Sequence, residues 1–219
     1  MLDKIKTFIK NASSREPFDP SRFNDSVAEK SGWNPLKRGG TNFRTHSLTE
    51  MDYNRLQYKI SPGMMIFSLL FTAIGVGAGW FINSQLAVQY SGFSLGTHWP
   101  VLVFGGLFTG AGLGMLYSGS KPIVFDKIRG FYWKGRKEPN VSMKEDELKD
   151  ACRLSSIHAI QVIRERVRSD KKSYYSYEIN LVKKNGDRLN VIDHAKRDVI
   201  LEDAKKLSEF LGKPVWDAS

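Results

Sequence analysis

The chain has 219 residues, a formal net charge of +10 and 26% charged residues, a length that suits one membrane unit and one small soluble domain. Its single cysteine, Cys152, excludes an intramolecular disulfide framework and any metal site with several cysteine ligands. The basic excess favours anionic lipid head groups or an acidic protein as partners, although segments that flank a membrane on its cytoplasmic side are often basic as well.

Residues 1–42 are predicted to form an amphipathic helix and an extended linker. The first eleven residues carry an apolar stripe at helical spacing, made of Leu2, Ile5, Phe8 and Ile9. Such a helix lies on the cytoplasmic leaflet or docks on a partner, with a frayed terminus as the alternative. The following tract, rich in Pro, Ser, Asn and Gly, presents Phe18, Phe23 and Trp33 as candidate contacts for a protein partner or for the membrane interface.

Residues 43–60 are predicted to form a β-hairpin. Apolar and polar residues roughly alternate on both sides of the turn-like tripeptide Asp52-Tyr53-Asn54. A hairpin this short needs further strands to be stable, and the only candidates lie beyond the apolar region. We therefore expect the strands before and after that region to belong to one sheet.

Residues 61–120 are predicted to be a transmembrane hairpin of two helices. No Lys, Arg, Asp or Glu lies between Lys59 and Lys121, and each charge at the centre of a bilayer costs about 2.5–3.5 kcal/mol. The helices are expected at about 63–82 and 99–117, each near the roughly 20 residues that cross a bilayer.

Basic residues flank both outer ends of this unit, and none lies in the connection between the helices. Those before it are Arg44, Arg55 and Lys59, and those after it are Lys121, Lys127, Arg129, Lys134, Arg136 and Lys137. By the positive-inside rule, both termini are expected in the cytoplasm.

Glycines recur at four-residue spacing in both predicted helices. The helix-packing candidates are Gly75 and Gly79 in the first helix and Gly106, Gly110 and Gly114 in the second. Glycines at this spacing share one helix face and let another backbone approach closely. The two faces either pack against each other within the hairpin or leave one face for a helix of another subunit.

Residues 121–219 are predicted to be a strand-rich cytoplasmic domain closed by one helix. The expected strands are 122–126, 130–134, 157–168, 174–183 and 188–192. Asn185-Gly186 is a strong hairpin turn between the last two. A helix is expected at about 194–211, with Asp193 as its N-cap and Gly212 after its end.

This run of hairpins and a final helix resembles the bacterial pleckstrin-homology-like domain. The segment Phe-Asp-Lys-Ile-Arg-Gly-Phe-Tyr-Trp (125–133) is similar to the opening of such domains in two-span membrane proteins of unknown function, and 177–216 is similar to their ending. The similarity covers roughly 43–60 and 121–217. It implies an α+β cytoplasmic domain, a partly open barrel with a C-terminal helix, which binds proteins or lipids without catalysis.

No catalytic, cofactor-binding or metal site is predicted. The four histidines, His46, His98, His158 and His194, lie in unrelated contexts and none has a partner at metal-ligand spacing. The sequence contains neither a phosphate-binding loop nor a nucleophile elbow. Nucleic acid is not an expected partner, because no reading helix is evident and the chain is attached to a membrane.

One basic strand is a candidate surface for anionic lipid or an acidic protein. Arg164, Arg166 and Arg168 alternate along a predicted strand and therefore project from one face. Lys171 and Lys172 lie in the adjacent turn. An ordinary solvated face is the alternative interpretation.

The sequence therefore predicts a non-enzymatic accessory, assembly or regulatory subunit of a larger complex in a bacterial inner membrane. Its glycine-rich helices, N-terminal tract and cytoplasmic domain would bind the partners, and self-association stays open. The alternative is a sensor of anionic lipid in the cytoplasmic leaflet that uses the basic strand. An enzyme that modifies a membrane lipid is the third hypothesis.

Overall fold

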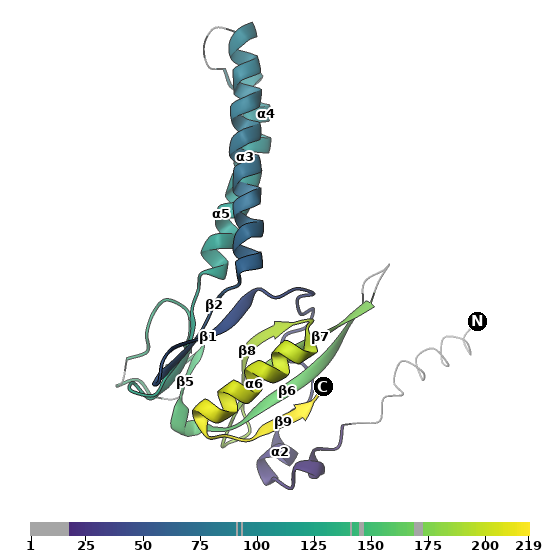
Figure 1. Cartoon of the computed structure of the whole chain (residues 1–219), viewed down its shortest axis with the longest axis vertical. Coiled ribbons are helices and arrows are strands. Elements are labelled where there is room, and N and C mark those ends of the chain that lie inside the picture. Colours follow the sequence, from purple (N-terminus) through teal and green to yellow (C-terminus); the bar gives the residue numbers. More distant parts are fainter. Residues whose placement is uncertain (1–17, 91, 93, 141, 145–146, 169–172) are drawn as a thin grey trace, which may run out of the picture.

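The computed structural model describes residues 18–90, 92, 94–140, 142–144, 147–168 and 173–219. These residues form an α+β structure with two long apolar helices and a β domain of two sheets and one long helix (Figure 1). The apolar helices project together from one end of the β domain.

The first sheet has five antiparallel strands in sequence order. They are β1 (His46–Asp52), β2 (Arg55–Ile60), β3 (Ile123–Asp126), β4 (Phe131–Lys134) and β5 (Ala151–Arg153). Strand β2 precedes the apolar helices and pairs with β3, which follows them, so that Leu56 lies opposite Phe125. The sequence predicts that the strands on the two sides of the apolar region share one sheet, and the structure adds which strands pair and in which register. The β2–β3 pairing also places both ends of the helical pair on the same side of the β domain.

The second sheet has the order β8-β7-β6-β9. Its strands are β6 (Ile157–Arg168), β7 (Ser173–Lys183), β8 (Arg188–His194) and β9 (Val215–Ala218). The β6–β7 and β7–β8 pairs are antiparallel hairpins. Strand β9 runs parallel to β6, with Val215 opposite Ile160, and was not predicted.

Helix α6 (Arg197–Leu211) begins later than the sequence suggests. Its N-cap is Lys196, and Asp193 belongs to β8 instead. The Asp193 carboxylate accepts a hydrogen bond from the Thr41 N–H at 3.0 Å, so the prediction that Asp193 caps the helix is wrong. The helix ends as predicted at Gly212, whose φ of 62° is a left-handed cap.

One apolar core lies between the two sheets and α6. It contains Tyr58 and Phe125 from the first sheet, Ile160 and Ile179 from the second, and Leu207 from the helix, all fully buried. In Figure 1, α6 lies across the second sheet. The core thus joins strands from both sides of the apolar region into one folded unit.

The two apolar helices are longer than predicted. The first is α3 (Pro62–Gln89), and the second runs over Leu95–Gly119 as α4 (Leu95–Pro100), a π-helical segment η2 (Val101–Gly105) and α5 (Gly106–Gly119). Both are long and apolar enough to cross a membrane. At about 1.5 Å per residue, α3 is about 42 Å long, which exceeds the ~30 Å hydrocarbon core of a bilayer.

Residues 18–42 are not the extended linker that the sequence suggests. They contain a short 3-10 helix η1 (Pro20–Phe23) and the helix α2 (Ser26–Lys30), and they pack on the face of the second sheet opposite α6. Figure 1 shows α2 at the end of the β domain remote from the apolar helices. The amphipathic helix predicted at the N-terminus lies outside the described residues.

Carboxylates of the second sheet hold the backbone of residues 36–41. Glu178 accepts hydrogen bonds from the Leu36 and Lys37 N–H groups at 2.9 and 3.2 Å. Glu165 accepts from the Gly39 and Gly40 N–H groups, and Asp193 from Thr41. The three carboxylates come from three neighbouring strands, β6, β7 and β8, so residues 36–41 are attached across the sheet. Because the sheet binds their backbone, these residues need no regular spacing of apolar side chains.

Candidate functional site

Close packing of glycines joins α3 to the second apolar helix. A Cβ atom on Gly75 would collide with the backbone nitrogen of Thr109 and lie 2.9 Å from the Gly105 carbonyl oxygen. A Cβ atom on Gly105 would lie 3.0 Å from the Cα of Gly79. Only glycine permits this approach, which gives the backbones dispersion contacts that lipid cannot match.

A second contact lies nearer the β domain. A Cβ atom on Gly112 would lie 2.6 Å from the Thr72 nitrogen and 2.7 Å from the Ser68 carbonyl oxygen. The hydroxyls of Ser68 and Thr72 donate to carbonyls one turn earlier in α3, at 2.8 and 3.0 Å. Because these hydroxyls are satisfied by their own helix, the interface is held by close packing.

The other three candidate glycines lie outside this interface. A Cβ atom on Gly106, Gly110 or Gly114 would have open space around it. Gly106 and Gly110 instead line a shallow groove between the two helices, together with Gly75, Val76, Gly79, Trp80, Val101, Gly105, Thr109 and Leu113. We call it the glycine groove.

The π-helical segment η2 lies at the level of the closest contact. It follows Pro100, which has no N–H to donate within the helix, and it ends at Gly105. A π turn shifts the following residues around the helix axis. Gly105 and Gly112 are seven residues apart, about two turns of the regular helix α5, and both face α3, whereas the four-residue series beginning at Gly106 lies on a different face.

The arginine strand, made of Arg164, Arg166 and Arg168, projects all three side chains into solvent. Arg164 lies over the ring of Tyr175 at 5.1 Å, and the remaining residues named for this surface, Lys171 and Lys172, lie outside the described residues. In Figure 1, β6 and β7 extend beside the β domain toward the side from which the apolar helices project.

The aromatic residues of the N-terminal tract contact the chain itself. Phe18, Phe23 and Trp33 form one cluster, with ring centroids 4.4 Å apart for Phe18–Trp33 and 5.4 Å for Phe23–Trp33. Phe23 and Trp33 also pack on Trp216 of β9, at 5.7 and 5.9 Å. The three rings thus pack on one another and on β9, yet each stays partly exposed, so their binding to a partner or to the membrane interface stays a prediction.

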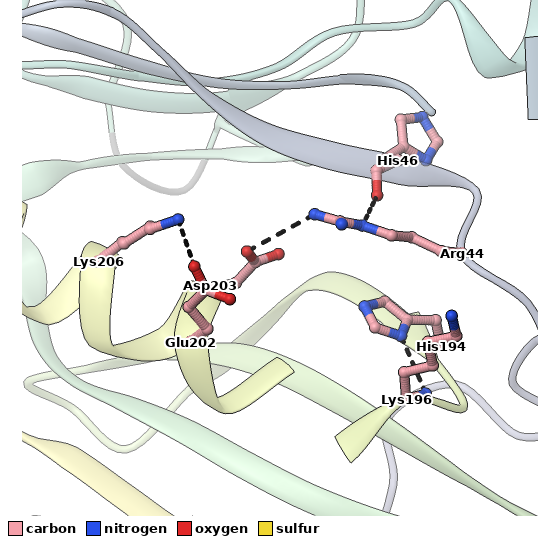
Figure 2. A network of polar contacts seen from close by, with 7 residues as sticks. All are labelled: Arg44, His46, His194, Lys196, Glu202, Asp203 and Lys206. Atoms are coloured by element: carbon pink, nitrogen blue, oxygen red, sulfur yellow. Dashed lines mark hydrogen bonds and ion pairs between the residues drawn. The ribbon is translucent and has the colours of Figure 1, made fainter. Parts of the chain in front are cut away.

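A buried polar network lies between α6 and the start of β1 (Figure 2). The guanidinium of Arg44 lies 3.9 Å from the carboxylate of Asp203 in α6, and its Nε donates to the His46 carbonyl at 2.9 Å. Burial raises the pKa of Asp203 to about 6, and the charge of Arg44 opposes that rise. Burial and the charge of Arg44 lower the pKa of His194 to about 4. At neutral pH the network therefore holds an Arg44–Asp203 ion pair beside a neutral His194.

This network adjoins the start of α3. The Arg44 carbonyl accepts a hydrogen bond from the Ser61 hydroxyl at 2.7 Å, and the Ser61 N–H donates to the Thr45 carbonyl at 2.8 Å. Ser61 is the N-cap of α3 and accepts from the Met64 N–H. The first turn of α3 is thus fixed to the β domain through Arg44 and Thr45, and the Arg44 side chain in turn pairs with Asp203 of α6.

His158, another side chain that could take part in chemistry, makes structural contacts instead. His158 in β6 lies 2.7 Å from the Asp25 carboxylate, which caps α2, and beside the ring of Trp216. Among the described residues, no three His, Cys, Asp or Glu side chains are grouped so that they could hold a metal ion.

Comparison with known proteins gives no relative from which to infer a function. No family model, curated protein or solved structure matches the chain. The geometry of the helices, the groove and the charged surfaces is therefore the basis for a functional proposal.

Proposed function

We propose that the protein is a multi-pass protein of a bacterial inner membrane, with α3 and the helix 95–119 as its spans and both termini in the cytoplasm. The spans carry no formal charge, while basic residues flank their outer ends and not their connection. The β2–β3 pairing supports this arrangement, because it requires both outer ends to lie on one side.

Within that membrane, the protein acts as a non-enzymatic accessory, assembly or regulatory subunit that binds a helix of a larger complex. The observation that carries the proposal is the glycine groove: Gly106 and Gly110 line it and no other described residue fills the space at their Cβ positions. A helix from a partner would gain there the close backbone contact that Gly75 and Gly105 already make inside the hairpin.

The β domain supports the choice of a binding protein over an enzyme. Two sheets, antiparallel except for β9, with a long helix near the C-terminus, are compatible with the pleckstrin-homology-like arrangement that the sequence resembles. His158 pairs with the cap of α2, and His194 is fully buried beside Arg44. These contacts give both histidines a structural role.

Gentle extraction of the tagged full-length protein from its native membrane, with mass spectrometry of what co-purifies, tests the proposal. The wild type is expected to retain a stoichiometric membrane partner. Gly110→Leu should lose it, because the new side chain would occupy the groove from a position where a Cβ atom meets no atom of the neighbouring helix.

Gly77→Leu is the matched control. It adds the same side chain at a glycine of α3 that has open space and does not line the groove, so the partner should stay bound. A wild-type protein that always purifies alone would contradict the proposal, as would a partner that Gly110→Leu retains.

The second candidate function is sensing of anionic lipid by the arginine strand. Its support is the exposure of Arg164, Arg166 and Arg168 on one face of a hairpin whose strands extend toward the side from which the apolar helices project. Basic residues close to a membrane surface attract anionic lipid by about 1 kcal/mol each. This surface is separate from the glycine groove, so the two functions do not exclude each other.

A further inference from the structure

A cleft lies at the base of the helical pair, against the last turn of α5. Its volume is about 640 Å³, and it is bordered by the β3–β4 hairpin, by β8 and by the start of β1. Its basic and aromatic lining residues include Lys37, His46, Tyr117, Lys121, Lys134 and Arg136. We call it the basal cleft.

Positive charge predominates in the basal cleft. Four cations, Lys37, Lys121, Lys134 and Arg136, face two carboxylates, Asp150 and Asp193. The Asp193 carboxylate is already engaged by the Thr41 N–H. The pKa of His46 is lowered by burial and by Lys134, which leaves this ring neutral at pH 7.

Two of these cations have fixed positions. Arg136 donates to the Ser120 hydroxyl at 2.6 Å and stacks on Tyr117 at 4.1 Å, which fixes it at the C-terminal end of α5. The Lys134 ammonium donates to the Val191 carbonyl at 3.0 Å and has two further hydrogens to offer. Both side chains are thus held at the wall of the cleft.

The other two cations have no counter-ion among the described residues. Neither Lys37 nor Lys121 forms an ion pair there. Lys37 is close enough to Lys134 that its charge, after burial, contributes to lowering the Lys134 pKa to about 8. An anion between these ammonium groups would relieve the repulsion and accept their hydrogen bonds.

The position of the cleft indicates the kind of anion. Tyr117 and Ser118 belong to the last turn of the second apolar helix, and both line the cleft. The exposed apolar residues Leu113 and Tyr117 continue from the cleft along the outside of α5. An anion seated here is adjacent to an apolar surface along which hydrocarbon chains can lie.

We propose that the basal cleft binds the phosphate head group of an anionic phospholipid, with Lys37, Lys121 and Lys134 as its ligands and the acyl chains along α5. This inference rests on the proposed membrane insertion of the two helices. The head-group site does not depend on a partner in the glycine groove, because no residue that lines the cleft also lines the groove; Leu113, on the path of the acyl chains, is the one residue named for both.

The test uses the full-length protein in nanodiscs made of equal parts of phosphatidylcholine and phosphatidylglycerol. Native mass spectrometry then measures how much phosphatidylglycerol stays bound after the disc is removed. We expect the wild type to retain it and Lys37→Ala with Lys121→Ala to weaken retention about tenfold to thirtyfold, because two head-group contacts are lost. Lys134→Met, which keeps the apolar stem, should weaken it as well.

Two matched double variants control for net charge. Lys184→Ala with Lys205→Ala removes two lysines that do not line the cleft and should retain the lipid. Arg166→Ala with Arg168→Ala tests the arginine strand. If this arginine variant alone loses the lipid, or if all variants lose it equally, the assignment to the cleft is overturned.

Two further outcomes distinguish a bound lipid from a soluble phosphate and from a protein that does not enter the bilayer. Inorganic phosphate is titrated into the protein in discs of pure phosphatidylcholine, and binding as tight as that of the lipid would overturn the lipid assignment in favour of a soluble phosphate. A wild type that does not enter nanodiscs would instead refute membrane insertion. Entry with lipid retention independent of the lysines would refute this inference alone.

Discussion

Replacing Gly75 or Gly112 by leucine is expected to force the two apolar helices apart. At Gly112 even a Cβ atom would lie 2.6 Å from a backbone nitrogen and 2.7 Å from a carbonyl oxygen of α3, and backbone atoms cannot move aside as a side chain can. Overpacking of this kind costs about 1–3 kcal/mol or more. Reversible unfolding in mixed micelles, followed by circular dichroism, measures the loss.

The controls for this prediction are Gly77→Leu and Gly114→Leu. At both positions an added Cβ atom meets no other atom within 4 Å, so the free energy of unfolding should stay within about 0.5 kcal/mol of the wild type. Equal destabilisation by all four substitutions would show that the helices do not pack through Gly75 and Gly112.

Trp216→Ala is expected to destabilise the β domain by about 3–5 kcal/mol and to release the N-terminal tract. The ring is 2% exposed and touches Phe23, Trp33 and His158, so its removal leaves a cavity between β9 and the tract. Urea unfolding gives the stability, and limited proteolysis under native conditions should detect faster cleavage before residue 42.

Tyr53→Ala serves as the comparison, because it also removes a large aromatic ring but at a position that is 81% exposed. It should change stability by less than about 0.5 kcal/mol and leave the tract protected. A Trp216→Ala protein as stable as this control, with the tract still protected, would mean that β9 and the tract do not hold each other.

Local signals in the sequence were sufficient to predict most elements of the fold. Asn185-Gly186 defines the β7–β8 hairpin, the uncharged stretch after Lys59 defines the apolar helices, and Gly212 ends α6. That the strands before and after the apolar region share one sheet was also predictable, because a lone hairpin before that region required further strands.

The elements that were missed depend on contacts distant in sequence. The tract at 18–42 has no apolar periodicity: its first half is held by scattered rings that pack on Trp216, and residues 36–41 are held by their backbone on the carboxylates of the second sheet. Strand β9 is short, and its pairing with β6 is visible only once the sheet exists. Asp193 resembles a helix cap in sequence, yet its partner is Thr41.

The candidate site was likewise predictable only in part from the sequence. Four-residue spacing identifies glycines that share a helix face, but it cannot say which face meets the neighbouring helix. In the structure Gly105 and Gly112, which are seven residues apart, face α3, and the series beginning at Gly106 does not. The basal cleft was not predicted, because Lys37, Lys121 and Lys134 converge only after the tract and the β3–β4 hairpin meet at the base of α5.

The most direct test of the proposed role is to trap whatever lies in the glycine groove in the native membrane. A photoreactive benzoyl-phenylalanine is placed at Leu113, which lines the groove, and separately at Leu70, which is exposed on α3 and does not line it. We predict one discrete adduct with a different membrane protein from Leu113 and none from Leu70. Adducts with lipid alone at both positions, or with a second copy of this chain, would contradict the proposal.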